Sequence, residues 1–260
     1  MTNNWRDKYH WVGPFSEGLA AVELKGKYGF VDETGKEVIP LKYNWVGPFS
    51  QGLAQVKFNR MYGFVDQQGK VVIPLKYNWV GPFSQGLAQV KFNRMYGFVD
   101  KKGNEVIPLK YDSVGPFSEG RAKVKLKGKW GFIDKTGKEV VPLKYDEVGD
   151  FNDGLAKVKL NGQYGFIDVM GKEVVPVRYD YVGNFRDGFA KVKLDGYWGY
   201  VDTTGKEVLP CVYKEEDLPE IKDILATSKR FKRMYTSFKK ELKAVRPDFE
   251  WTAWYEQVIK

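Results

Sequence analysis

The sequence has very little cysteine and histidine, with only Cys211 and His10 among its 260 residues. One residue of each kind cannot supply the three or four ligands of a His/Cys zinc site. The glycine motifs of nucleotide-binding loops and the G-x-S-x-G turn of hydrolases are absent as well. We therefore expect no metal, no cofactor and no enzymatic activity.

Long apolar runs are also missing. No segment approaches the about 18 consecutive apolar residues that a membrane helix needs. Residues 1–5 do not place a basic flank before an apolar run, so they do not resemble a signal peptide. A single cysteine excludes an internal disulfide framework and is typical of a reducing compartment. We expect a soluble, cytoplasmic protein without a membrane span.

What the sequence does contain is a repeat. An aromatic residue, Gly, a second aromatic residue, Val or Ile, and Asp follow one another six times, at a spacing of 34 residues. A fixed period of this length indicates an architecture in which each unit buries its apolar face only against its neighbours. We assign residues 9–213 to six units, after a lead-in of residues 1–8 in which Trp5 covers the first unit. The six copies begin at Tyr28, Tyr62, Tyr96, Trp130, Tyr164 and Trp198.

Each unit carries three strand signals. In the fourth unit, Arg121–Leu126 alternates apolar and basic residues, and a two-residue turn leads to the partner strand Trp130–Asp134. A second turn precedes a short third strand, Glu139–Val141, which Pro142 is expected to stop because proline cannot donate to a ladder. The segment Tyr145–Gly154, rich in glycine and aspartate, is predicted to be a surface link to the next unit.

An aspartate ends the second of these strands in every unit. Each unit offers only one such carboxylate, whereas a calcium loop supplies several oxygen ligands. We therefore interpret these aspartates as turn caps rather than cation ligands. They are Asp32, Asp66, Asp100, Asp134, Asp168 and Asp202.

The strand signals predict an all-β tandem repeat array of six three-strand units, with an open solenoid as the preferred arrangement. A closed six-bladed propeller is the alternative, although 34 residues is short for a four-stranded blade. Residues 214–260 differ from the repeats. Glycine is absent from residues 215–246 and apolar residues recur at helical spacing, so we expect a small C-terminal α-helical module.

The fourth unit resembles a known family. Its core Lys129–Lys138, followed by Val141, Pro142 and Tyr145–Ala156, is similar to the WG-containing repeat family of bacteria. The resemblance covers residues 9–212, and in four of the six copies tyrosine replaces the tryptophan. It implies an all-β repeat array with a binding or scaffolding role, and it brings no common catalytic residues.

One repeat position indicates a surface that binds a partner. Because this position accepts serine and glutamate in some copies, its three tryptophans are expected to be exposed and to form an aromatic stripe on the N-terminal half. The alternative is that each tryptophan folds over the loop of its own repeat. In order, the position holds Trp11, Trp45, Trp79, Ser113, Glu147 and Tyr181.

The second and third repeats add two unusual arginines. Arg60 and Arg94 replace the glycine of the first hairpin turn, so this turn is expected to be of a different type or strained. Both arginines are candidate partner-binding residues. These two repeats are otherwise nearly identical, and they differ only at Gln67/Lys101, Gln68/Lys102, Lys70/Asn104 and Val71/Glu105.

Basic residues recur on the first predicted strand and in the C-terminal module, and the formal net charge is +9. They suit an anionic partner, or they are simply a solvated face and an end cap. The strand positions are Lys57, Lys91, Lys125, Lys159 and Lys193. The C-terminal candidates for partner binding are Lys229, Arg230, Lys232, Arg233, Lys239 and Lys240.

These features predict a non-catalytic scaffold or adaptor that binds a macromolecular partner, in the first place another protein, through the repeat surface and the C-terminal helices. The alternative is a nucleic-acid-binding accessory protein that uses the basic helix and exposed tryptophans. A carbohydrate-binding module is a third, less favoured hypothesis.

Overall fold

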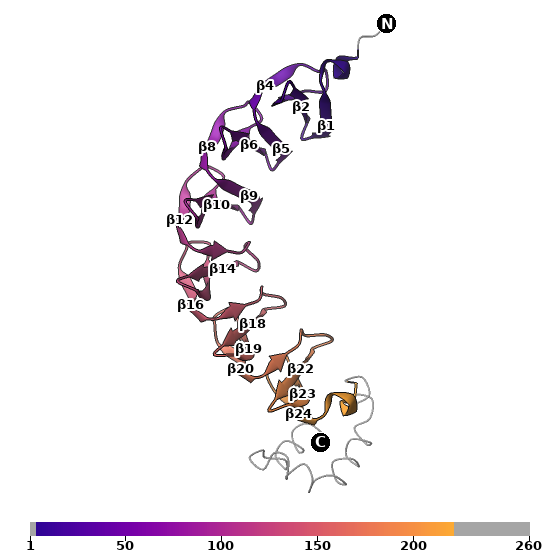
Figure 1. Ribbon diagram of the computed structural model, residues 1–260, viewed down its shortest axis with the longest axis vertical. Coiled ribbons are helices and arrows are strands. Elements are labelled where there is room, and N and C mark those ends of the chain that lie inside the picture. Colours follow the sequence, from indigo (N-terminus) through magenta and orange to yellow (C-terminus); the bar gives the residue numbers. More distant parts are fainter. Residues whose placement is uncertain (1–3, 221–260) are drawn as a thin grey trace. The chain divides into compact units, whose positions relative to one another are not determined.

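The computed structural model describes residues 4–220 (Figure 1). In this range the chain forms 24 β-strands and two short 3-10 helices, η1 (Trp5–Lys8) and η2 (Glu215–Asp217). The chain divides into two compact units, Met1–Leu143 and Lys144–Lys260. No helix within residues 4–220 is long and apolar enough to cross a membrane.

Every repeat is an antiparallel sheet of four strands, and their order in the sheet follows the sequence. The first strands are β1 (Trp11–Ser16), β5 (Trp45–Ser50), β9 (Trp79–Ser84), β13 (Ser113–Val114), β17 (Glu147–Val148) and β21 (Tyr181–Val182). The second strands are β2 (Leu19–Leu24), β6 (Leu53–Phe58), β10 (Leu87–Phe92), β14 (Arg121–Leu126), β18 (Leu155–Leu160) and β22 (Phe189–Leu194). The third strands are β3 (Lys27–Val31), β7 (Met61–Asp66), β11 (Met95–Asp100), β15 (Lys129–Asp134), β19 (Gln163–Asp168) and β23 (Tyr197–Asp202). The fourth strands are β4 (Glu37–Tyr43), β8 (Val71–Tyr77), β12 (Glu105–Tyr111), β16 (Glu139–Tyr145), β20 (Glu173–Tyr179) and β24 (Glu207–Tyr213).

The prediction of three-strand units is therefore wrong, and with it the reason for preferring an open solenoid. The segment interpreted as a link forms the first strand of each sheet. Few residues of the second repeat lie outside strands. They are the three turns 51–52, 59–60 and 67–70, together with the single residue at the junction on either side of the sheet, Asn44 before it and Asn78 after it. Thirty-four residues thus suffice for a four-stranded sheet, which is the unit from which β-propeller blades are built.

Glycine and proline misled the strand prediction because bulges absorb them. In β5 the pairing with β6 shifts between Val46 and Phe49, so Gly47 and Pro48 lie in an irregularity within the strand. Pro142 does not stop its strand either, since β16 runs from Glu139 to Tyr145. The fourth strand lies at the edge of its sheet, where a missing N–H is tolerated.

The aromatic-Gly pair of the third strand has a steric cause. In the fifth repeat Tyr164 pairs with Tyr179 and Phe166 with Val175, so three residues of β20 bulge opposite Gly165. A Cβ atom at Gly165 would lie 2.5 Å from the Val175 carbonyl oxygen. The other five copies have the same close approach to backbone atoms. This glycine therefore lets the bulged fourth strand cross the third.

The C-terminal α-helical module predicted for residues 214–260 is not found in the part that the structure describes. Residues 214–220 contain only the 3-10 helix η2. Residues 221–260, which include the six basic candidates of the module, lie outside the described residues.

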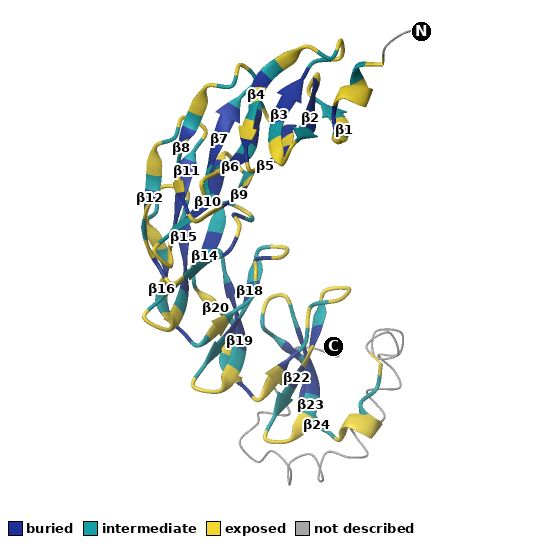
Figure 2. Cartoon of the chain, turned by 45° about the horizontal axis from the view of Figure 1, so that its top comes forward, coloured by how far each residue is buried: buried dark blue, intermediate teal, exposed yellow. Residues whose placement is uncertain are grey.

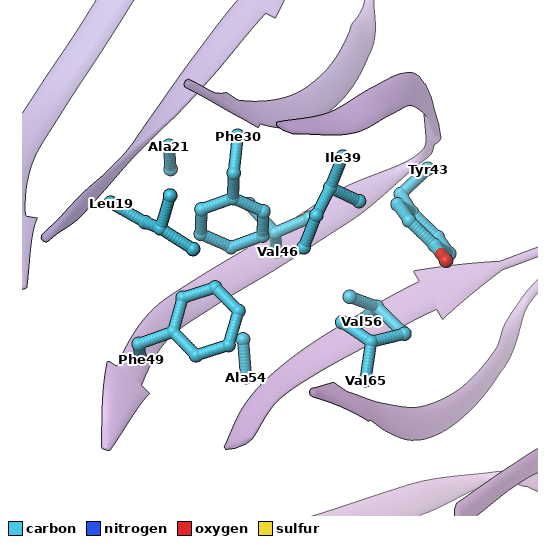
Figure 3. Packing of buried hydrophobic residues seen from close by; sticks show 10 residues of the cluster. All are labelled: Leu19, Ala21, Phe30, Ile39, Tyr43, Val46, Phe49, Ala54, Val56 and Val65. Carbon is cyan, nitrogen blue, oxygen red and sulfur yellow. The ribbon is translucent and has the colours of Figure 1, made fainter. Parts of the chain in front are cut away.

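Neighbouring sheets share a hydrophobic core. Phe30 on β3 packs against Phe49 on β5 of the next repeat, with ring centroids 4.8 Å apart, and Ile39 and Ala54 lie beside the two rings (Figure 3). The pairs Phe64–Phe83 and Phe98–Phe117 repeat this contact. Figure 2 shows the same division in each sheet, with buried residues along the strands and exposed residues in the turns. Within the unit Met1–Leu143, each sheet is therefore stabilised by its neighbour, as the period implies.

The lead-in covers the first sheet. Trp5 in η1 lies edge-on to Tyr9 and Phe15, with ring centroids 6.3 Å away in both cases. It also contacts Gly35 in the turn between β3 and β4. Trp5 thus supplies the apolar cover that later sheets receive from the repeat before them.

The aspartates cap their turns, as predicted. Asp134 Oδ1 accepts hydrogen bonds from Thr136 N at 2.9 Å, Thr136 Oγ1 at 2.6 Å and Lys138 N at 3.1 Å. The hydroxyl of Thr136 contributes most to lowering the pKa of Asp134. The equivalent aspartates accept the same backbone bonds. Their carboxylates are therefore engaged in local turn structure.

The two arginine turns are of the same type as the glycine turns, and they carry strain. Asn59 and Arg60 have φ angles of 46° and 68°, close to the 51° and 81° of Lys127 and Gly128. Both central residues with positive φ define a type I′ turn, which favours glycine in the second position. Asn59 N also donates to Asn44 Oδ1 at 2.9 Å, which fixes the turn to the junction between repeats.

We expect Arg60→Gly to raise the free energy of unfolding by about 0.5–1 kcal/mol, because it removes the clash of a Cβ atom in left-handed backbone, partly offset by the flexibility of glycine. Chemical denaturation measures the change. Arg60→Ala is the matched control, since it removes the guanidinium and keeps the Cβ. An equal gain from the alanine variant would assign the effect to charge instead of backbone strain.

Candidate functional site

A row of side chains crosses each sheet beside the hairpin turn that joins its second and third strands. In the second repeat, Trp45 on β5 lies opposite Lys57 on β6. Lys57 in turn lies opposite Tyr62 on β7. Cross-strand partners project from the same face of an antiparallel sheet, so these three side chains are neighbours. We call the three equivalent positions in each repeat the Trp-Lys-Tyr row.

The composition of this row changes along the chain. Repeats two and three have the same residues, and the others differ in at least one position. The rows are Trp11, Glu23 and Tyr28; Trp45, Lys57 and Tyr62; Trp79, Lys91 and Tyr96; Ser113, Lys125 and Trp130; Glu147, Lys159 and Tyr164; and Tyr181, Lys193 and Trp198.

The three tryptophans are exposed and are also folded over their own repeats. The exposed fractions of Trp11, Trp45 and Trp79 are 49%, 40% and 39%. A Cβ atom at Gly47 would lie 3.2 Å from the Trp45 ring, and the ring centroid of Trp45 lies 6.2 Å from that of Tyr62. One face of each indole therefore rests on the sheet, while a large part of the ring stays open to solvent.

The lysines of the row lie over aromatic rings. Lys57 Nζ is 5.0 Å from the ring centroid of Tyr62, and Lys91 Nζ is 4.8 Å from that of Tyr96. Lys125 Nζ lies 5.6 Å from the ring of Trp130. These distances fit cation–π contacts, which hold an ammonium group in place without neutralising its charge.

A groove lies between the second and third repeats, within the unit Met1–Leu143. Its volume is about 510 Å³, and its walls bring together two of the predicted tryptophans. Beside the tryptophans lie the ammonium group of Lys57 and the side-chain amides of Gln55 and Asn44. The groove therefore combines an aromatic surface with one cation and two amides. It is lined by Asn44, Trp45, Gln55, Lys57, Tyr62, Trp79 and Val80.

The fifth repeat has an acidic row. Glu147 occupies the tryptophan position, and its Oε1 accepts a hydrogen bond from Lys159 Nζ at 2.9 Å. This bond raises the pKa of Lys159 to about 12. At the sixth repeat, a hollow of about 700 Å³ is lined by Tyr181, Trp198 and Glu215 of η2, among others. Glu215 lies four repeat lengths after Trp79 and therefore occupies the equivalent position. The hollow at the sixth repeat thus has a carboxylate where the groove at the second repeat has the indole of Trp79.

The remaining predicted residues do not join the groove. Trp11 packs against Tyr28 in the first repeat, with ring centroids 6.3 Å apart. Arg60 and Arg94 are exposed at hairpin turns, outside the lining of the groove. Among residues 4–220, no group of three or more His, Cys, Asp or Glu side chains is placed to hold a metal ion. The groove is therefore suited to binding by stacking, hydrogen bonding and charge.

Sequence reasoning identified the tryptophans and the recurring lysines separately, but missed that they form one row. The missing information is the register between the first and second strands, which depends on the bulge at Gly47 and Pro48. The signal was present in the spacing. Lys57 and Tyr62 flank a two-residue turn, and Trp45 precedes Lys57 by 12 residues, as the equivalent residues do in the third repeat.

Among solved structures, the chain is distantly similar to several proteins. Kluyveromyces lactis Hsv2p is 10% identical with a TM-score of 0.37, over 74% of this chain and 74% of that chain. A eukaryotic initiation factor is 11% identical with a TM-score of 0.40, over 81% and 67%. PorZ, a surface component of the type-IX secretion system of Porphyromonas gingivalis, is 10% identical with a TM-score of 0.33, over 80% and 38%. Similarities this distant transfer no function to the chain, and no curated protein matches the sequence.

A family model matches almost the whole described chain. The model of the WG containing repeat matches seven consecutive segments, and the five middle ones each run from one aromatic-Gly pair to near the next. The segments are residues 8–28, 28–60, 62–94, 96–130, 130–164, 164–198 and 198–215. With this coverage, and with the glycine of each aromatic-Gly pair required by the bulged fourth strand, the chain belongs to the WG containing repeat family.

Proposed function

We propose that the protein is a non-catalytic interaction protein, a scaffold or adaptor that binds another protein through the groove between its second and third repeats. The observation that supports the proposal is the pair of exposed indoles, Trp45 and Trp79, in one groove with the charged side chain of Lys57. Tryptophan is enriched among residues that carry most of the energy of protein interfaces. A binding role is also consistent with the fold, because the aspartates that recur in every repeat accept hydrogen bonds within turns.

The test is affinity capture with the full chain and with a Trp45→Ala/Trp79→Ala double variant, followed by titration calorimetry with the purified protein that the wild type captures. We expect the double variant to lose at least 2 kcal/mol of binding free energy, because two partly desolvated anchors are removed. Tyr181→Ala is the matched control, since it removes an exposed aromatic residue from the same position of the sixth repeat.

A partner that binds the double variant as tightly as the wild type would contradict the groove as its site. The nucleic-acid alternative predicts a different result, namely binding of mixed-sequence RNA or DNA that weakens steeply with salt. The same titrations, carried out with oligonucleotides at low and high salt, therefore separate the two functions.

A further inference from the structure

Three lysines of the Trp-Lys-Tyr row carry a charge that the described chain does not neutralise. Lys57, Lys91 and Lys125 each lie over an aromatic ring. Within residues 4–220, none of the three forms an ion pair. All three belong to the unit Met1–Leu143 and recur on successive sheets. Because the rings hold them in place, these ammonium groups form an ordered series of cations, one for each repeat.

The fifth repeat indicates which group complements such a lysine. There Glu147 replaces the tryptophan, and its carboxylate bonds Lys159 across the strand pair. Lys159 lies over the ring of Tyr164 at 5.0 Å, as Lys57 lies over Tyr62. A carboxylate on the first-strand side of the lysine can therefore form an ion pair with it while the lysine keeps its contact with the aromatic ring. In repeats two to four the residue opposite the lysine is Trp45, Trp79 or Ser113, none of which has a carboxylate, so a matching acid has to come from another molecule.

Resting on the proposed function, we propose that repeats two to four bind an extended acidic segment of the partner protein. Carboxylates of the segment pair with Lys57, Lys91 and Lys125, and apolar side chains between them contact Trp45 and Trp79. The fifth repeat, with its internal pair, interrupts the series, and Lys193 over the ring of Trp198 is the equivalent lysine of the sixth repeat.

The spacing of the sheets sets the spacing of the acids. Packed sheets lie about 10 Å apart, and an extended chain advances about 3.3 Å for each residue. Side chains three residues apart in a β-strand point to opposite faces, whereas a polyproline II segment, which has three residues per turn and rises about 3.1 Å per residue, presents one face every third residue. The matching segment therefore has an acidic residue at every third position, with apolar residues or proline between the acids.

The charge density favours a peptide over a nucleic acid. One lysine for each sheet gives one positive charge in about 10 Å, whereas a nucleic-acid strand carries a phosphate about every 3.4 Å. A peptide with acids about 10 Å apart neutralises the lysines without placing further negative charge between them.

The test uses the full chain and a fluorescein-labelled peptide of four Glu-Pro-Leu units, measured by fluorescence anisotropy at low salt. We expect a Lys57→Gln/Lys91→Gln/Lys125→Gln variant to bind the peptide about tenfold more weakly, as three exposed ion pairs predict. Replacing every glutamate of the peptide by glutamine is expected to have the same effect. Lys159→Gln, which removes a lysine already paired with Glu147, is the matched control and is expected to change the affinity less than twofold.

A second variant keeps the test independent of the lysines. Trp79 lies opposite Lys91, as Glu147 lies opposite Lys159 in the fifth repeat. Trp79→Glu therefore places a carboxylate where it can form an ion pair with Lys91 inside the third repeat. We expect this variant to remain folded, by circular dichroism, and to bind the peptide more weakly than Trp79→Gln does. Equal binding by these two variants would contradict the pairing of Lys91 with a carboxylate.

Several results would overturn the acidic segment. These are no peptide binding by the wild type, equal binding by the triple lysine variant, or tighter binding of a mixed-sequence single-stranded RNA of equal charge. A captured partner that the triple lysine variant retains and the Trp45→Ala/Trp79→Ala variant loses would contradict only the acidic segment and leave the proposed function standing. If both variants retain that partner, the result would contradict the acidic segment and the proposed function alike.

Discussion

Gly165→Ala is expected to lower the free energy of unfolding by about 3 kcal/mol. The new Cβ atom would meet the carbonyl oxygen of Val175 at 2.5 Å and backbone atoms of Pro176 at 2.8 to 2.9 Å. Backbone atoms cannot rotate away as a side chain does, so the bulge in β20 must shift or open. Guanidinium denaturation followed by circular dichroism measures the loss, and hydrogen exchange shows whether it begins in this repeat.

The same repeat provides the matched control. Gly149 does not have a positive φ, and a Cβ atom there would meet Lys157 atoms no closer than 3.7 Å, an ordinary van der Waals distance. We expect Gly149→Ala to be neutral or to stabilise by about 0.5 kcal/mol, because alanine restricts the unfolded chain. Similar losses for both variants would show that the bulge does not explain the aromatic-Gly pair.

Val71→Glu is expected to raise the free energy of unfolding by about 1 kcal/mol, because it completes a contact that the second repeat lacks. In the third repeat, Tyr77 Oη donates to Glu105 Oε1 at 3.1 Å and Lys76 Nζ donates to the same oxygen at 2.8 Å. One repeat earlier, Tyr43 Oη is buried without a hydrogen-bond partner, and Val71 occupies the position of the glutamate.

The reverse change is the control. Glu105→Val leaves the buried hydroxyl of Tyr77 unpaired, and we expect it to cost about 2 kcal/mol. These substitutions exchange one of only four differences between two nearly identical repeats, so the surroundings are matched. A destabilising Val71→Glu would mean that the tyrosine contact contributes less than the cost of desolvating a carboxylate.

The contact is also expected to depend on pH. The hydrogen bond from Lys76 contributes most to lowering the pKa of Glu105 below its ordinary value of 4.5. A group whose pKa is lowered by folding stabilises the folded state above its unfolded pKa, and this contribution is lost as the pH falls through the folded value. The difference in unfolding free energy between Glu105→Val and wild type should therefore be full at pH 7 and shrink below pH 4.5.

The sequence predicts the local features of this fold better than the strand count. Alternation in Arg121–Leu126 and the turn before Trp130 depend on nearby residues, so the hairpin is correct. The first strand was missed because Gly47 and Pro48 are typical of a turn, whereas pairing with β6 holds them in a bulge. Pro142 misled in the same way, since only the sheet order reveals that it lies on an edge strand.

The candidate site could be predicted only in part. Comparison of the six copies indicated that Trp45 and Trp79 are exposed, because no core position accepts both tryptophan and glutamate. Their common groove with Lys57 could not be predicted, since it depends on strand register and on the packing of one sheet against the next. The pairing of Glu147 with Lys159 depends on the same register.

A single residue, Asn78, separates β8 from β9. Because β8 and β9 belong to different sheets, inserting or deleting one residue at such a junction would change how the next sheet packs against the one before it. Gain or loss of a whole copy leaves every junction at one residue, and the near identity of residues 43–76 and 77–110 fits a copying event of this kind. Each new copy of this type would add one more indole and one more ammonium group, so gene duplication would set how long a ligand the protein can accommodate.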